Sequence, residues 1–135
     1  MEKIKVTISW SGDNYAATST DVNGVVIATH KTLEGVKKGF ESAFKFHIKG
    51  SVADGDNISE NIKKGKYLFD YDFHISAILH DLDGLVTRAA LSRVTGINEK
   101  QLGHYLSGFR NPRPAQREKI ISGVHALGRQ LISVV

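Results

Sequence analysis

The sequence predicts an α+β protein in which a strand-strand-strand-helix-strand unit (residues 1–73) precedes an all-helical unit (residues 74–135). In the first half, apolar and polar side chains alternate with a period of two, whereas in the second half apolar residues recur every three to four positions. Turn-forming dipeptides separate the expected strands, and glycine and proline bound the later helices. A chain of 135 residues has room for two small domains.

Three short strands are expected first. Residues 3–10 alternate between polar and apolar side chains, the pattern of a half-buried strand. Two turns separate this strand from strands at 15–19 and 25–30, and the second turn contains Asn23-Gly24, which tolerates positive φ. The third strand is apolar enough to be expected in the middle of the sheet.

A helix that begins after the cap Thr32 is expected to lie on this sheet. Gly35 and Gly39 each weaken it by roughly 1 kcal/mol relative to alanine, and we expect them to allow close approach to the sheet. Residues 50–66 are polar and weakly patterned, which predicts a long mobile loop. Residues 67–73 form a last strand with an aromatic row on one face and two aspartates on the other. The expected sheet-facing residues of the helix are Leu33, Val36, Phe40, Ala43, Phe44 and His47.

Residues 87–119 predict two short helices joined by a tight turn, then a basic loop and a third helix that begins near Pro114. Gly96 ends the first helix, and Asn98 with Gln101 forms an Asn-x-x-Gln capping box at the second. This is the pattern of a helix-turn-helix, whose second helix enters the major groove of DNA. The alternative is that the two helices serve packing alone.

The expected DNA contacts are the side chains that face away from the buried side of the second helix, together with the loop that follows. We expect base-edge contacts from Lys100, Gln101 and His104. We expect phosphate contacts from Asn98, Arg110 and Arg113, while Glu99 shares the exposed face and Tyr105 belongs to the core.

The formal net charge of +4 comes entirely from the second half of the chain. The first half carries only lysines, which its acids balance, whereas most cations of the second half are arginines, which suit phosphate and guanine recognition. Such asymmetry is typical of nucleic-acid binding, although a basic half can also be a solvated surface. The cations of the second half are Arg88, Arg93, Lys100, Arg110, Arg113, Arg117, Lys119 and Arg129.

Catalytic and metal-binding patterns are missing. The chain has no cysteine, and its six histidines include no His-x-x-x-His pair. It contains neither a nucleophile elbow nor a phosphate loop, so we expect no enzymatic activity, no metal and no cofactor. The alternative is a nuclease-like enzyme that loses activity on chelation. Without a signal peptide or a long apolar run, we expect a cytoplasmic protein that does not enter a membrane.

The segment LSRVTGINEKQLGHYLSGFRNP (residues 91–112) carries a first resemblance. It is similar, position by position, to DNA-binding proteins of the phage-repressor type, which have a Gly-x-Arg-x-Pro element where this chain has Gly108 to Pro112. Ser92 departs from the alanine that is usual in that class, but it is small enough to fit.

A second resemblance covers the expected strand-helix unit. The runs at 21–25, 30–36 and 40–44 resemble, in order, the Asp-x-Pro-Gly turn, the helix start and the Glu-Ala-Ile continuation of the HicB antitoxin family. The departures are Asn23 for proline, His30 for glycine and Gly35 for glutamate. A first domain followed by a C-terminal helix-turn-helix is also the HicB order.

The HicB resemblance implies an inactive, RNase H-like first domain that covers a HicA-like RNA-cleaving toxin. It also implies a second domain that represses its own operon at operator DNA as a homodimer or higher oligomer. Because such a toxin needs a basic surface, we expect Asp70 and Asp72 to contact it, although one strand face must be solvated in any case. The alternative function is a stand-alone transcriptional repressor whose N-terminal domain senses a small molecule in a pocket. The apolar stripe at the end of the last helix is expected to pack on a partner subunit.

Overall fold

A computed structural model describes the whole chain, residues 1–135. The chain divides into two compact units, Met1–His74 and Ile75–Val135, one residue beyond the expected boundary. The first unit is a four-stranded sheet with helices, and the second is all-helical, so the α+β class is confirmed. None of the helices combines the length and the apolar content that crossing a membrane requires.

The sheet of the first unit has the order β3-β2-β1-β4. Strands β1, β2 and β3 form an antiparallel meander, and β4 pairs parallel with β1 on its other side. The expected central position of the third strand is therefore wrong, because the return of the chain to β1 leaves β3 at an edge, where Ile27 is 58% exposed. The strands are β1 (Glu2–Trp10), β2 (Tyr15–Ser19), β3 (Val26–His30) and β4 (Tyr67–Phe73).

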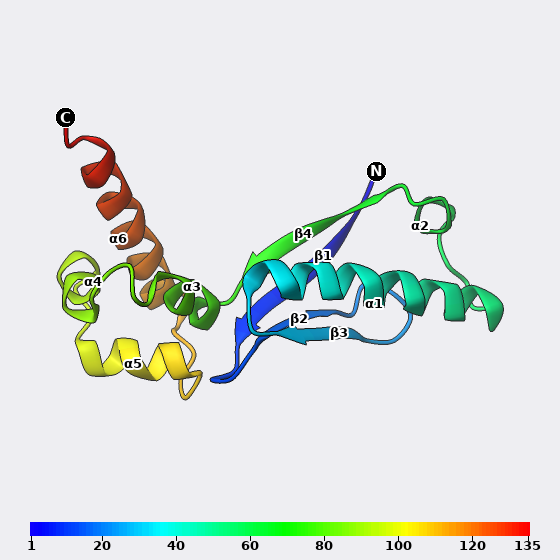
Figure 1. Cartoon of the computed structure of the whole chain (residues 1–135), viewed down its shortest axis with the longest axis horizontal. Coiled ribbons are helices and arrows are strands. Elements are labelled where there is room, and N and C mark those ends of the chain that lie inside the picture. The colour runs from blue at the N-terminus through cyan, green and yellow to red at the C-terminus, as the bar shows by residue number, and fades with distance from the viewer. The chain divides into compact units, whose positions relative to one another are not determined.

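Helix α1 (Leu33–Ala53) covers one face of this sheet (Figure 1). Thr32 caps it as expected, since its hydroxyl oxygen accepts the N–H of Gly35 at 3.0 Å. The rings of Phe40 and Phe44 are fully buried, and both lie 5.2 Å from the ring of Phe69 on β4. This aromatic cluster forms the core between helix and sheet.

Residues 50–66 are not the long loop that their composition predicts. Helix α1 continues to Ala53, and a short helix α2 (Glu60–Lys63) follows. Ser59 caps α2 and also donates its hydroxyl to Glu2 Oε1 at 2.7 Å, while Ile58 and Ile62 are buried. Two isoleucines four residues apart are too few to reveal a helical pattern in a polar stretch. Their burial nevertheless fixes this segment to the core.

The second unit packs four helices around one apolar core. Gly96 adopts a left-handed conformation (φ 74°) that ends α4, and Ile97 is buried in the corner that follows, as the sequence predicts. Pro114 occupies the first turn of α6. The helices are α3 (Ile75–Leu82), α4 (Arg88–Thr95), α5 (Glu99–Ser107) and α6 (Pro114–Ile132). The buried core comprises Ile75, Leu79, Leu91, Ile97, Leu102, Tyr105 and Ile120.

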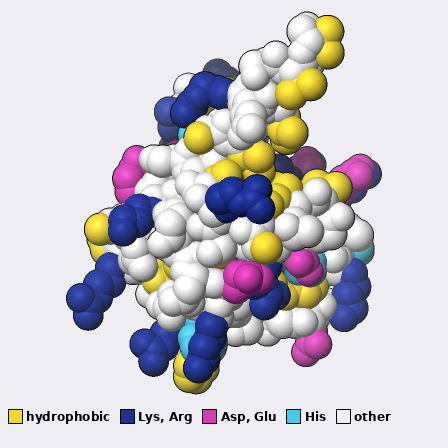
Figure 2. Space-filling view, turned by 90° about the vertical axis from the view of Figure 1, so that its left-hand side faces the viewer, with side chains coloured by type: hydrophobic (Ala, Val, Ile, Leu, Met, Phe, Trp, Pro, Cys, Tyr) yellow, Lys and Arg dark blue, Asp and Glu magenta, His cyan; other side chains and the backbone are white.

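Helix α6 changes character along its length. Ile120 is fully buried and Val124 packs against the core. Toward its end, Leu131 and Ile132 are 63% and 86% exposed, and Figure 2 shows hydrophobic side chains along the projecting helix at the top of the view. The first half of the helix thus belongs to the core, and its last turns have no cover within the chain.

Candidate nucleic-acid interface

The start of α5 is held by its cap. Asn98 Oδ1 accepts the N–H of Gln101 at 2.8 Å. The second bond of a capping box, from the Asn98 N–H to the Gln101 side chain, is not formed. The Gln101 amide instead donates to the Tyr105 hydroxyl at 2.9 Å. Glu99 lies in the first turn, where a carboxylate stabilises the helix dipole. Leu102 and Tyr105 are buried, so the exposed side of α5 carries Glu99 and Lys100.

A polar hollow of about 510 Å³ lies where α5, the loop after it and the start of α6 meet. It brings together three of the expected DNA-binding residues, Gln101, Arg110 and Arg113. Two guanidinium groups beside amide donors suit a phosphate group, because each guanidinium offers a planar fork of N–H donors. The remaining lining residues are Tyr105, Asn111 and Gln116.

The start of α6 adds to this hollow. Arg113 is the N-cap residue, but no side chain caps the helix. The first N–H groups of a helix have no intrahelical partner, and the helix dipole makes this end positive. Such free N–H groups favour anions, and Gln116 in this first turn lines the hollow.

His104, which is expected to contact base edges, packs against the loop after α5. It is half-buried, and its ring packs edge-on against Phe109 at 5.1 Å between centroids. Its Nδ1 is buried without a hydrogen-bond partner. Phe109 is itself 70% exposed, and Arg110 Cζ lies 5.8 Å from the centre of its ring. The exposed aromatic group at this loop is thus Phe109, which sequence reasoning did not single out as a contact.

Arg88 is another cation that sequence reasoning did not place at α5. A Cβ atom on Gly103 would lie 3.0 Å from Arg88 Nη1, so this guanidinium covers the α5 backbone at a residue without a side chain. Arg88 occupies the first turn of α4, where a cation opposes the helix dipole, but this position alone does not point to α5. Asn111 and Gln116 gave no signal either.

Asp70 and Asp72 lie on the sheet face opposite α1, and both are exposed. In the parallel register, Asp70 pairs with Lys5, and Lys5 Nζ lies 3.9 Å from Asp72 Oδ2. The face is therefore of mixed charge and forms no purely acidic patch. A toxin contact here would have to compete with Lys5 for Asp72.

Two further groups of the first unit have structural explanations. The Asp21 carboxylate accepts the N–H of Lys5 at 2.7 Å, which continues the bonding of β1 beyond the end of β2. Burial, and secondarily the charge of Glu41, raises the pKa of Tyr71 above its usual value, and Lys37 Nζ lies 4.7 Å from the centre of the Tyr71 ring. No group of three or more histidine, aspartate or glutamate side chains is arranged so that it could hold a metal ion.

No protein-family model matches this chain, and neither a curated protein nor a solved structure matches it significantly.

Proposed function

We propose that this chain is an antitoxin of the HicB kind. The first unit covers a HicA-like RNA-cleaving toxin, and the second unit binds operator DNA and represses the operon that encodes both proteins. The observation that carries the proposal is the polar hollow at α5, which Gln101, Arg110 and Arg113 line together. The protein acts in the cytoplasm, as a binding protein without catalytic activity.

The unpaired state of the cations supports the DNA half of this proposal. Lys100, Arg110 and Arg113 are exposed, and none of them forms an ion pair. Cations that meet phosphates release the counterions condensed on DNA, which drives association at low salt.

The DNA half is tested with three variants of the full chain on its preferred sequence, selected from a random duplex pool. Arg110→Ala is expected to weaken all sequences alike and to flatten the slope of log K against log salt by about one. Lys100→Ala is expected to cost about 1–3 kcal/mol on the preferred sequence and to relax its selection. Arg129→Ala, which removes an exposed cation far along α6, is the control. Unchanged binding in the first two variants would remove this site assignment.

A contact in the first unit supports the toxin half. Two of the three departures from the HicB pattern, His30 and Gly35, touch each other: a Cβ on Gly35 would overlap the His30 ring. The same ring accepts the N–H of Thr32 through Nδ1 at 3.0 Å, next to the cap of α1. The His30 ring occupies the space that Gly35 leaves free, so the two departures compensate for each other. This pairing favours a variant of the HicB strand-helix unit.

The neighbouring reading frame and a charge reversal test the toxin half. A short basic protein encoded beside this gene is expected to arrest growth, and co-expression of this chain is expected to relieve the arrest. Asp70→Lys with Asp72→Lys is expected to reduce the relief, because it places like charge against the toxin. The matched control reverses Asp13 and Asp56, which lie outside this sheet face. Full neutralisation by the Asp70/Asp72 variant would rule out this contact surface.

The exposed end of α6 supports self-association through a second copy. Leu131→Glu with Ile132→Glu is expected to convert the protein to a monomer in sedimentation equilibrium without loss of helix content. A variant that sediments like the unmodified chain would exclude this surface from the oligomer.

A stand-alone repressor that senses a small molecule is the second candidate. The observation that favours it is an apolar groove of about 430 Å³ in the first unit, between α1 and α2. If no toxin reading frame lies beside the gene and the chain still binds DNA, the stand-alone repressor is favoured over the antitoxin.

A further inference from the structure

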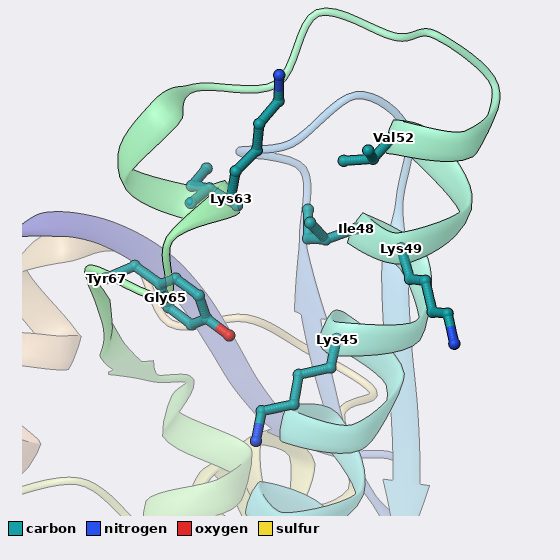
Figure 3. A pocket seen from close by; sticks show the side chains of 8 residues that line it. Lys45, Ile48, Lys49, Val52, Lys63, Gly65 and Tyr67 are labelled. Carbon is teal, nitrogen blue, oxygen red and sulfur yellow. The ribbon is translucent and has the colours of Figure 1, made fainter.

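The groove of the first unit lies between the last turns of α1 on one side and α2 with the start of β4 on the other. Figure 3 shows Ile48 and Val52 projecting from α1 into the opening, with Lys63 and Tyr67 on its other side. Lys45, Ile48, Lys49 and Val52 follow helical spacing, so one stripe of α1 forms the whole wall.

The inner surface of the groove is apolar and already formed. Ile48 and Ile62 are buried at its base, while Val52 is 45% exposed on its wall. The Tyr67 ring is held from behind by Phe44, at 5.0 Å between centroids. Contacts with the core thus hold these apolar side chains in place, although part of the surface they form is exposed to water.

The rim of the groove is basic. Its charged lining residues are Lys45, Lys49 and Lys63, and no acid lines it. Lys45 Nζ pairs with Glu41 at 3.2 Å and Lys63 Nζ pairs with Glu60 at 3.5 Å, whereas Lys49 forms no ion pair. Such exposed pairs are weak, so an entering anion can compete for these ammonium groups.

We propose that this groove binds a small amphiphile with an aliphatic body and one anionic head, of the class of medium-chain carboxylates. The apolar base takes the chain, and the lysines at the rim hold the head. The volume of about 430 Å³ lies within the range of small-molecule sites, roughly 300–1,000 Å³. The inference depends on neither toxin nor DNA binding, and it names the ligand class for the sensing candidate.

The test titrates the full chain with hexanoate, octanoate and decanoate below their micelle concentrations, and it follows the methyl NMR signals of Ile48, Val52 and Ile62. Saturable binding is expected to tighten about fourfold for each CH₂ group buried, until the chain outgrows the groove. Decyltrimethylammonium, with the opposite charge, is expected to bind roughly tenfold more weakly than decanoate.

Two substitutions with matched controls localise the site. Val52→Asp is expected to weaken decanoate roughly tenfold, because it removes apolar wall and adds like charge. Phe46→Asp alters another exposed apolar residue of α1, 81% exposed and outside the groove, and is expected to leave the affinity unchanged. Lys49→Glu is expected to weaken binding severalfold, whereas Lys38→Glu, at a lysine elsewhere on α1, is not.

Three results would overturn the proposal. The first is the absence of saturable binding at any chain length. The second is equal affinity for the carboxylate and the ammonium, which would show a plain apolar surface. The third is an equal loss of affinity in Val52→Asp and in its Phe46→Asp control.

Discussion

Replacing Gly123 with alanine tests how closely α6 crosses α4. A Cβ at this position would lie 2.7 Å from the carbonyl oxygen of Val94 and 2.9 Å from Thr95 Cγ2. Overpacking costs about 1–3 kcal/mol, and the upper end applies because the obstacle is mainly backbone. Alanine recovers about 1 kcal/mol through its higher helix propensity. We therefore expect Gly123→Ala to lower the free energy of unfolding by about 2 kcal/mol.

Gly128 provides the control within the same helix. No atom lies within 4 Å of its Cβ position, so Gly128→Ala is expected to gain up to about 1 kcal/mol. The two variants should then differ by about 3 kcal/mol in urea unfolding followed by far-ultraviolet circular dichroism. If Gly123→Ala unfolds at the same urea concentration as the unmodified chain, or if both variants lose stability equally, the close crossing is refuted.

Three further substitutions test local features. The raised pKa of Tyr71 means that the folded chain holds this proton more tightly, so the associated stability is present below about pH 10 and is lost as pH rises through the folded pKa. Tyr71→Phe is expected to reduce the alkaline loss of stability, measured as the urea midpoint at about pH 8 and about pH 11. Gly35→Ala is expected to cost about 1–3 kcal/mol by displacing the His30 ring, and a second change, His30→Ala, should restore most of it in a double-mutant cycle. Asn98→Ala is expected to cost about 1 kcal/mol in urea unfolding, because it removes the cap of α5.

The strands could be predicted because burial follows a local period. Ile4, Val6 and Ile8 are completely buried on one face of β1, and the aromatic row of β4 faces the core. The position of β3 in the sheet could not be predicted in this way. After α1 the chain returns as β4 and pairs with β1, which leaves β3 at the edge. This long-range pairing cannot be read from the composition of β3.

The candidate interface shows the same division between local and distant information. Asn98, Gln101, Arg110 and Arg113 lie in a continuous pattern of cap, helix and loop, so the sequence alone could identify them. Arg88 comes from the preceding helix and reaches α5 only because Gly103 lacks a side chain. That contact becomes visible only when two helices are placed side by side.

The distribution of ion pairs bears on whether the basic second half is merely a solvated surface. In four surface ion pairs, a lysine of the first unit meets an acid of the same unit. Four of the ten lysines of that unit are thus paired, whereas Lys100, Arg110 and Arg113 form no ion pair. Arg110 and Arg113 line one hollow, and no ion pair has to break before a phosphate group binds to them. The unpaired guanidinium groups at this hollow thus support the proposed binding of nucleic acid.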